Sequence, residues 1–215
     1  MKSNIKDEIL QTAKLLFNQQ GYEAVSMRDI ARAVGISVGN LTYHFPRKAD
    51  ILLALLSLSR NPGLYTIEVH TLSDMDTLIR NLLLSVVDYS FYFRNVGHFM
   101  ADDELKQNEF LNSDIIRQNF LQGLKQLVKE GYFKPEFTPA LAQTMGYFML
   151  LSHYSWAQYT ILSGTDQSDA LDRFVGEHWA VLAPYFSEKG AAEFHMLAKQ
   201  KCGRTSWFLP HFSRL

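Results

Sequence analysis

The sequence has little of what stabilises small secreted or β-rich proteins. It contains one cysteine, Cys202, together with 12 glycines and 6 prolines in 215 residues. A single thiol excludes a disulfide within the chain and fits a reducing compartment. Because few residues favour tight turns, a many-turned β-sandwich is disfavoured.

Long apolar runs and a strong charge imbalance are also missing. The longest strictly apolar run is Ile51–Leu56, and the apolar window Met145–Leu162 is interrupted by polar residues. A membrane-spanning helix needs about 20 apolar residues, and no secretory signal opens the chain. We therefore expect a soluble cytoplasmic protein. The net charge of −1 does not by itself predict nucleic-acid binding, although residues 1–50 carry seven Lys/Arg against five Asp/Glu.

What the sequence does contain is apolar residues at three- and four-residue steps along most of its length, which predicts an all-α fold. Hydrophobic residues make up 47% of the chain, enough to fill a core. In the first sixty residues we expect helices at Ile5–Gln20, Ser26–Val34, Ser37–His44 and 46–60. Gly21 and Gly35 follow the first two, where a left-handed residue commonly ends a helix.

Longer helices are expected in the remainder. A capping box of Ser73 and Asp76 predicts the start of a helix that runs to Phe93. Further helices are predicted at Asp114–Glu130, Pro139–Leu162, Ser168–Phe186 and Ala191–Lys201, with a looser segment over residues 95–110. These patterns predict one domain at residues 1–50, a larger helical domain at 51–202 and a mobile tail at 203–215.

The most informative stretch is Ser26–Lys48, which predicts a helix, a turn at Gly35-Ile36 and a second helix. This order is a helix-turn-helix. The inward residues of the second helix are Ile36, Leu41 and Phe45, and its outward residues are Val38, Asn40, Thr42, Tyr43 and His44. Short polar and aromatic side chains can contact base edges and phosphates, and the two helix starts offer free N–H groups to phosphates.

The same stretch resembles the head of the TetR family of bacterial regulators. The resemblance covers residues 5–52 without gaps and rests on Gly21-Tyr22, Ser26, Ile30-Ala31, Gly35-Ile36-Ser37, Val38-Gly39, Tyr43-His44-Phe45 and Lys48. It implies a three-helix helix-turn-helix DNA-binding domain, followed by a helical-bundle ligand-binding and dimerisation domain. The implied function is transcription regulation.

The resemblance also implies a role for each DNA-binding residue. Ser26 and Arg28 hold phosphates from the start of the second helix, and Lys48 grips a further phosphate. Ser37, Val38 and Asn40 face bases or the sugar edge, and Tyr43 and His44 hold phosphates beside the groove. Thr42 belongs to the same outward set but departs from the family, which often has Tyr there, so its base-reading role stays open.

Aromatic residues indicate a small-molecule site in the larger domain. Only four of the 28 aromatics lie in the first 50 residues, and helices rich in aromatics and Met can line an apolar cavity. The candidate ligand-binding residues are Phe91, Phe99, Asn119, Met145, Phe148, Met149, His153, Trp156 and Trp179. The alternative for each is an ordinary place in the core.

Ala140–Leu162 and Ser168–Phe186 are the predicted homodimer helices, since each carries apolar residues on more than one face. A two-fold dimer places two recognition helices about one DNA turn apart, which predicts a pseudo-palindromic operator. The resemblance implies a repressor that a small, largely apolar ligand releases. The ligand, the operator and the direction of the response are not fixed by the sequence.

Two other classes of function were weighed. An enzyme is disfavoured because the sequence has no phosphate-binding loop, nucleophile elbow or zinc-protease motif, and we expect no cofactor and no metal. Glu177 and His178 are at most two groups of a metal site, and Cys202 is more simply incidental than a redox sensor. A helical interaction protein whose head no longer binds DNA is the second alternative.

Overall fold

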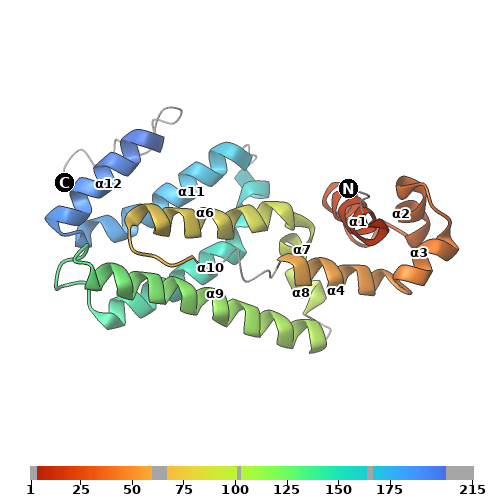
Figure 1. The fold of residues 1–215 in the computed structure, drawn as a ribbon, viewed down its shortest axis with the longest axis horizontal. Coiled ribbons are helices and arrows are strands. Elements are labelled where there is room, and N and C mark those ends of the chain that lie inside the picture. Colours follow the sequence, from red (N-terminus) through yellow and green to blue (C-terminus); the bar gives the residue numbers. More distant parts are fainter. Residues whose placement is uncertain (1–3, 60–66, 101–102, 164–166, 202–215) are drawn as a thin grey trace. The chain divides into compact units, whose positions relative to one another are not determined.

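The computed structural model describes residues 4–59, 67–100, 103–163 and 167–201, and nearly all of them are helical (Figure 1). Within these ranges, an isolated bridge between Phe133 and Phe186 is the only β feature. The chain divides into two compact units, residues 1–61 with 88–108, and residues 62–87 with 109–215. The predicted all-α class is confirmed.

The first unit is built on the four expected N-terminal helices. They are α1 (Ile5–Gln20), α2 (Met27–Val34), α3 (Val38–His44) and α4 (Lys48–Ser59). Two short helices, α7 (Ser90–Arg94) and α8 (Val96–Phe99), complete it. Its core includes fully buried apolar side chains from each of the first four helices, namely Ile9, Ala13, Phe17, Ile30, Leu41, Ile51 and Leu55.

Residues 88–108 belong to this first unit although they follow α6 in the sequence. The ring of Phe91 lies 5.3 Å from that of Phe17, and Phe99 lies 5.3 Å from Tyr22. Asn18 accepts the backbone N–H of Phe91 at 3.0 Å. Buried aromatic contacts thus attach α7 and α8 to α1. The sequence did not indicate this grouping, and the boundary expected at residue 50 stays a prediction.

The second unit consists of longer helices. They are α6 (Leu72–Asp88), α9 (Asp103–Lys129), α10 (Pro139–Ser163), α11 (Gln167–Leu182), a 3-10 turn at Ala183–Tyr185 and α12 (Glu188–Lys201). The last residue of α6 and residues 103–108 of α9 are grouped with the first unit. Trp179 of α11 is fully buried against Phe186 and Phe194. Because a Cβ on Gly190 would clash with the Tyr132 carbonyl oxygen, glycine is required where α12 packs against the backbone of Tyr132.

The beginning of α6 differs from the sequence-based expectation. The predicted capping box of Ser73 and Asp76 is wrong, since the Asp74 carboxylate accepts the Thr71 N–H at 2.8 Å and the Thr71 hydroxyl oxygen accepts the Asp74 N–H at 3.2 Å. Asp76 instead is 1% exposed and accepts hydrogen bonds inside the unit.

Two further boundaries are corrected. The helix expected to reach Phe93 ends at Asp88, because Tyr89 has φ −117° and ψ 34° and interrupts it before α7. The helix expected from Asp114 begins eleven residues earlier, at Asp103, so the segment 95–110 is more regular than predicted. The predicted tail at 203–215 lies outside the described residues. No helix in the described ranges is long and apolar enough to cross a bilayer.

Candidate nucleic-acid interface

The start of α2 is fixed by a reciprocal capping box. The Ser26 hydroxyl oxygen accepts the Asp29 N–H at 3.2 Å, and the Asp29 carboxylate accepts the Ser26 N–H at 3.0 Å. The hydrogen bonds from Ser26 hold the pKa of Asp29 below its usual range, so this carboxylate stays ionised near neutral pH. Both Ser26 and Arg28 are exposed beside this helix end.

The turn between α2 and α3 needs a glycine. Gly35 has φ +80°, a left-handed conformation that L side chains rarely adopt, and its N–H donates to the carbonyls of Ala31 and Arg32. Two residues later, the Ser37 hydroxyl oxygen accepts the Asn40 N–H at 3.1 Å and begins α3. The sequence therefore sets the two helices of the motif through local caps.

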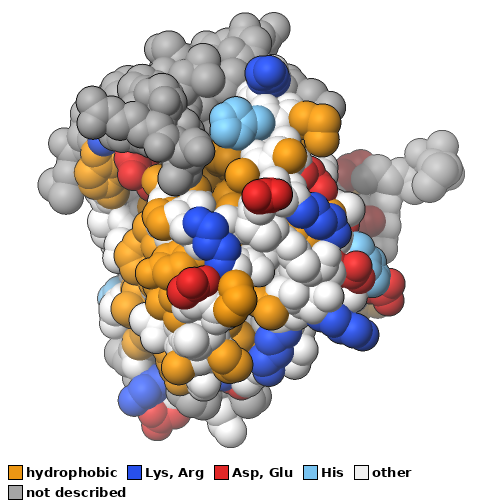
Figure 2. Space-filling view, turned by 90° about the vertical axis from the view of Figure 1, so that its left-hand side faces the viewer, with side chains coloured by type: hydrophobic (Ala, Val, Ile, Leu, Met, Phe, Trp, Pro, Cys, Tyr) orange, Lys and Arg blue, Asp and Glu red, His pale blue; other side chains and the backbone are white. Residues whose placement is uncertain are grey.

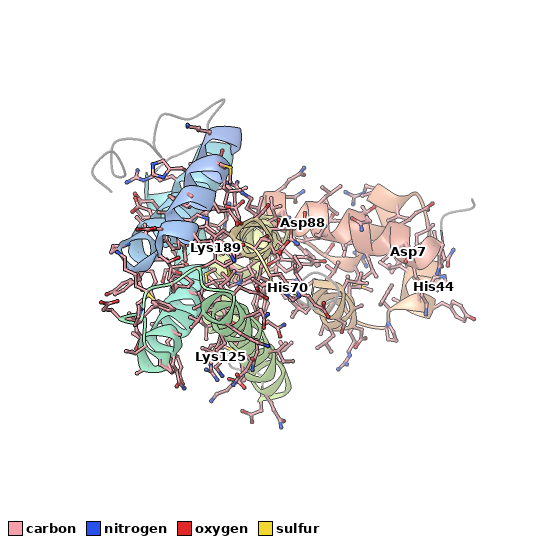
Figure 3. The ribbon with its side chains drawn as sticks, turned by 60° about the vertical axis from the view of Figure 1, so that its left-hand side comes forward. Asp7, His44, His70, Asp88, Lys125 and Lys189 are labelled. Atoms are coloured by element: carbon pink, nitrogen blue, oxygen red, sulfur yellow. The ribbon has the colours of Figure 1, made fainter. Side chains whose placement is uncertain are left out.

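The outward face of α3 is exposed, as a recognition helix requires. Leu41 and Phe45 are buried, whereas Asn40 is exposed and Tyr43 is 83% exposed. His44 is half-buried at the outer end of α3, with its ring 5.1 Å from that of Tyr43 (Figure 3). Of the predicted outward residues, Val38, Asn40 and Tyr43 are exposed, and Thr42 and His44 are half-buried.

The Thr42 hydroxyl is hydrogen-bonded within its own helix. The Oγ1 atom lies 3.0 Å from the Val38 carbonyl oxygen and 3.1 Å from that of Gly39. Since the carbonyls can only accept, the hydroxyl proton points into α3. A role of Thr42 as a hydrogen-bond donor to a base is therefore disfavoured, and an apolar contact is what its methyl group can offer.

Two cationic residues, Arg47 and Lys48, lie at the start of α4 and differ in their contacts. The ammonium group of Lys48 donates to the carbonyl oxygens of Tyr22 at 2.8 Å and Val25 at 3.1 Å. Arg47, which was not among the predicted DNA contacts, is 74% exposed and forms a 2.7 Å ion pair with Asp50. Only the position of Arg47 directly before Lys48 in the sequence could have indicated that Arg47 is a candidate DNA contact.

A second candidate site lies in the other unit, between α10 and α11. It is a cavity of about 200 Å³ with a mainly apolar lining. From α10 it takes Phe148, Ser152, Trp156 and Tyr159, which share one helix face, and from α11 it takes Ala170, Arg173, Phe174, Glu177 and His178. Trp156 is 2% exposed, and its indole N–H has no hydrogen-bond partner among the described residues.

His178 presents a neutral ring to this cavity. Its Nδ1 lies 2.8 Å from the Phe174 carbonyl oxygen, which can only accept, so Nδ1 carries the proton. Nε2 lies 2.9 Å from the Ser152 hydroxyl, whose single proton is shared between Nε2 and the Met149 carbonyl oxygen at 2.8 Å. Burial lowers the pKa of His178 to about 4, which agrees with a neutral imidazole.

The predicted ligand residues do not all come together. Phe148 and Trp156 line the α10–α11 cavity, and Asn119 lines a separate hollow of about 460 Å³ beside Val69 and His70. Met145, Met149 and His153 lie on α10 but do not line either space. Phe91 and Phe99 pack in the first unit, and the Trp179 indole N–H donates to Asp76 in the core of the second. The α11 residues that line the cavity were not among the predicted ligand-binding residues.

Comparisons with known proteins agree on one family. The model described as "Bacterial regulatory proteins, tetR family" matches residues 9–55, and that described as "Bacterial transcriptional repressor" matches residues 54–194. The probable HTH-type transcriptional regulator YttP of Bacillus subtilis is 25% identical over 146 residues, 64% of this chain and 69% of that protein. The HTH-type transcriptional repressor KstR2 of Rhodococcus jostii is 28% identical over 165 residues, 72% of this chain and 78% of that protein.

The fold has solved counterparts as well. A crystal structure of a TetR-family transcriptional regulator from Marinobacter aquaeolei superposes with a TM-score of 0.81 and 20% sequence identity. The superposition covers 92% of this chain and 98% of that one. The all-helical fold of this chain thus has a solved counterpart.

Proposed function

This chain belongs to the TetR family of bacterial transcriptional regulators, and on that premise we propose that it represses transcription in the cytoplasm by binding a pseudo-palindromic operator as a homodimer. The observation that carries the proposal is the exposed face of α3, where Val38, Asn40 and Tyr43 stand beside the capped starts of two helices. Such a helix can enter the major groove while the helix ends hold phosphates.

The proposed DNA contacts divide into two kinds. Val38 and Asn40 reach base edges from the start of α3, and Tyr43 and His44 reach the backbone beside the groove. Ser26, Arg28 and Ser37 bind phosphates at the two helix starts. Arg28 supplies a positive charge, so its loss should weaken the dependence of binding on salt.

The proposed dimer contact uses α10 and α11. Several large apolar side chains of these helices are exposed in the single chain, namely Tyr147, Phe148, Leu151, Tyr159 and Val181. Figure 2 shows a broad area of hydrophobic side chains along its left side, with charged side chains scattered across the view. A second copy that covers the α10–α11 face removes this apolar area from water.

The α10–α11 cavity is the proposed place for a small effector. Its size suits a compact apolar molecule, and the Trp156 N–H can donate to one acceptor atom of that molecule. Such a ligand can change operator affinity only by its different affinities for the DNA-binding and released conformations. Release of the repressor by the ligand is the direction we propose.

The test is fluorescence anisotropy with DNA over a salt series. Tyr43→Ala should weaken binding about tenfold, and Arg28→Ala should weaken it and flatten the salt dependence. Lys125→Ala is the control, because Lys125 is exposed on α9 in the second unit (Figure 3). If both head variants bind DNA like the unmodified protein, the chain is better described as a helical interaction protein.

A further inference from the structure

The ammonium group of Lys48 is engaged within the protein. Besides its hydrogen bonds to the carbonyls of Tyr22 and Val25, it lies 4.2 Å from the centre of the Tyr22 ring. An ammonium has three donors, and two of them are used here. The side chain is also half-buried, so two carbonyl oxygens and an aromatic ring already surround the ammonium group inside the protein.

We infer that Lys48 is a positioning residue for DNA binding, and that it acts by holding the Tyr22–Val25 segment against the start of α4 rather than by contacting phosphate. This inference rests on the proposed DNA-binding function. The held segment leads directly into Ser26, the capping residue of α2. Lys48 thereby fixes where the α2 start, with Ser26 and Arg28, meets the DNA backbone.

Other contacts of the segment show why a clamp is needed there. Tyr22 and Glu23 are not in a helix, and Gly21 before them has φ +85°. The centre of the Tyr22 ring lies 5.1 Å from that of Phe17 and 5.3 Å from that of Phe99. Lys48 supplies the hydrogen bonds that these apolar contacts cannot supply, because the carbonyls of Tyr22 and Val25 lie outside regular helix pairing.

Lys48→Met tests the inference, because Met keeps the chain length and removes the charge and the donors. We expect operator affinity to fall about tenfold while the slope of log binding constant against log salt stays as in the unmodified protein. Direct phosphate contact predicts a slope shallower by about 0.9 per lysine, or about 1.8 for a dimer on two half-sites. A slope change of that size overturns the inference and leaves the DNA-binding function standing.

A double-mutant cycle separates positioning from general destabilisation. Because Lys48 acts through the α2 start, combining Lys48→Met with Arg28→Ala should cost less than the sum of the two separate losses. The matched cycle with Tyr43→Ala, on the exposed face of α3, should be additive. Additivity in both cycles contradicts the inference.

Two further measurements separate a local effect of the substitution from a loss of folding. Binding is measured at a temperature where circular dichroism shows each variant folded. Lys48→Gln, which removes the charge but keeps an amide NH2 group, replaces Lys48→Met if the latter does not fold. Hydrogen exchange without DNA should be faster at residues 22–26 in either variant, and unchanged exchange there overturns the inference. Failure of the unmodified protein to bind any DNA would instead contradict the proposed function.

Discussion

At the scale of single residues, the second unit is held by a buried charge that the sequence did not reveal. Asp76 accepts the Trp179 indole N–H at 2.9 Å and the Arg80 Nε–H at 2.7 Å, and Arg80 also pairs with Asp172 of α11. The partners Asp76 and Trp179 are 103 positions apart. Only the folded arrangement could show that this aspartate faces inward.

Removing that carboxylate should destabilise the protein strongly. Asp76→Ala leaves the indole N–H and part of the half-buried guanidinium without acceptors, so we expect the free energy of unfolding to fall by about 3 kcal/mol. Urea unfolding followed by circular dichroism measures the change. Ser73→Ala, an exposed position on the same helix, is the control. A loss below about 0.5 kcal/mol for Asp76→Ala would show that the network contributes little.

The two buried histidines predict a loss of stability in acid. Burial lowers the pKa of His153 and of His178 to about 4, whereas an imidazole in the unfolded chain binds a proton near pH 6.5. The unfolded state therefore binds more protons between pH 6.5 and 4. The free energy of unfolding should therefore fall as pH drops through this window, by on the order of 1 kcal/mol per pH unit for each ring.

Urea unfolding at pH 6 and pH 5 checks this prediction. His178→Gln removes one of the two titrating rings, so its stability should fall less steeply over the same interval than that of the unmodified protein. Equal slopes in the two proteins would mean that His178 does not titrate as its burial requires.

At the scale of helices, the sequence predicts the ends of a helix correctly where the contacts that set those ends are local in the chain. The first four helices were predicted closely because their caps are local, as in the pairs Ser26–Asp29 and Ser37–Asn40. The start of α6 was misplaced because both Thr71–Asp74 and Ser73–Asp76 match a capping box, and only the distant partner Trp179 decides between them. The short helices α7 and α8 take their place from contacts with α1, which no local pattern records.

The two candidate sites differ in the same way in how far the sequence predicts them. The outward face of α3 could be predicted because the proposed DNA-binding residues lie within one short segment. The cavity could be predicted only on its α10 side, because its α11 residues are brought together by helix packing. The hydrogen bonds of Lys48 could not be predicted, because they are made to the backbone carbonyls of Tyr22 and Val25, which no side-chain pattern identifies.

The cap of α2 gives a prediction at this scale. Ser26→Ala removes the acceptor for the Asp29 N–H, and we expect a loss of about 1 kcal/mol in the free energy of unfolding. Ser26→Asp should retain most of the stability, because Asp is an equally good capping residue. Thermal unfolding of the two variants checks this, and equal stability of Ser26→Ala and the unmodified protein would contradict it.

At the scale of the whole molecule, the exposed apolar face of α10 and α11 should determine the oligomeric state. Leu151 is 67% exposed in the single chain. Leu151→Lys places a charge where a second copy would pack, so sedimentation should show a monomer and operator affinity should fall at least tenfold. Leu15→Lys, at a 58% exposed position on α1, is the matched control. A dimer that survives Leu151→Lys unchanged would place the interface elsewhere.

The most direct test of the account is selection of DNA from a random pool by the unmodified protein, followed by sequencing of what it retains. We predict enrichment of one pseudo-palindromic sequence, with half-sites about one helical turn apart and two chains bound per site. Enrichment of a non-symmetric sequence by a single chain would contradict the dimeric mechanism. No enrichment at all would contradict operator binding.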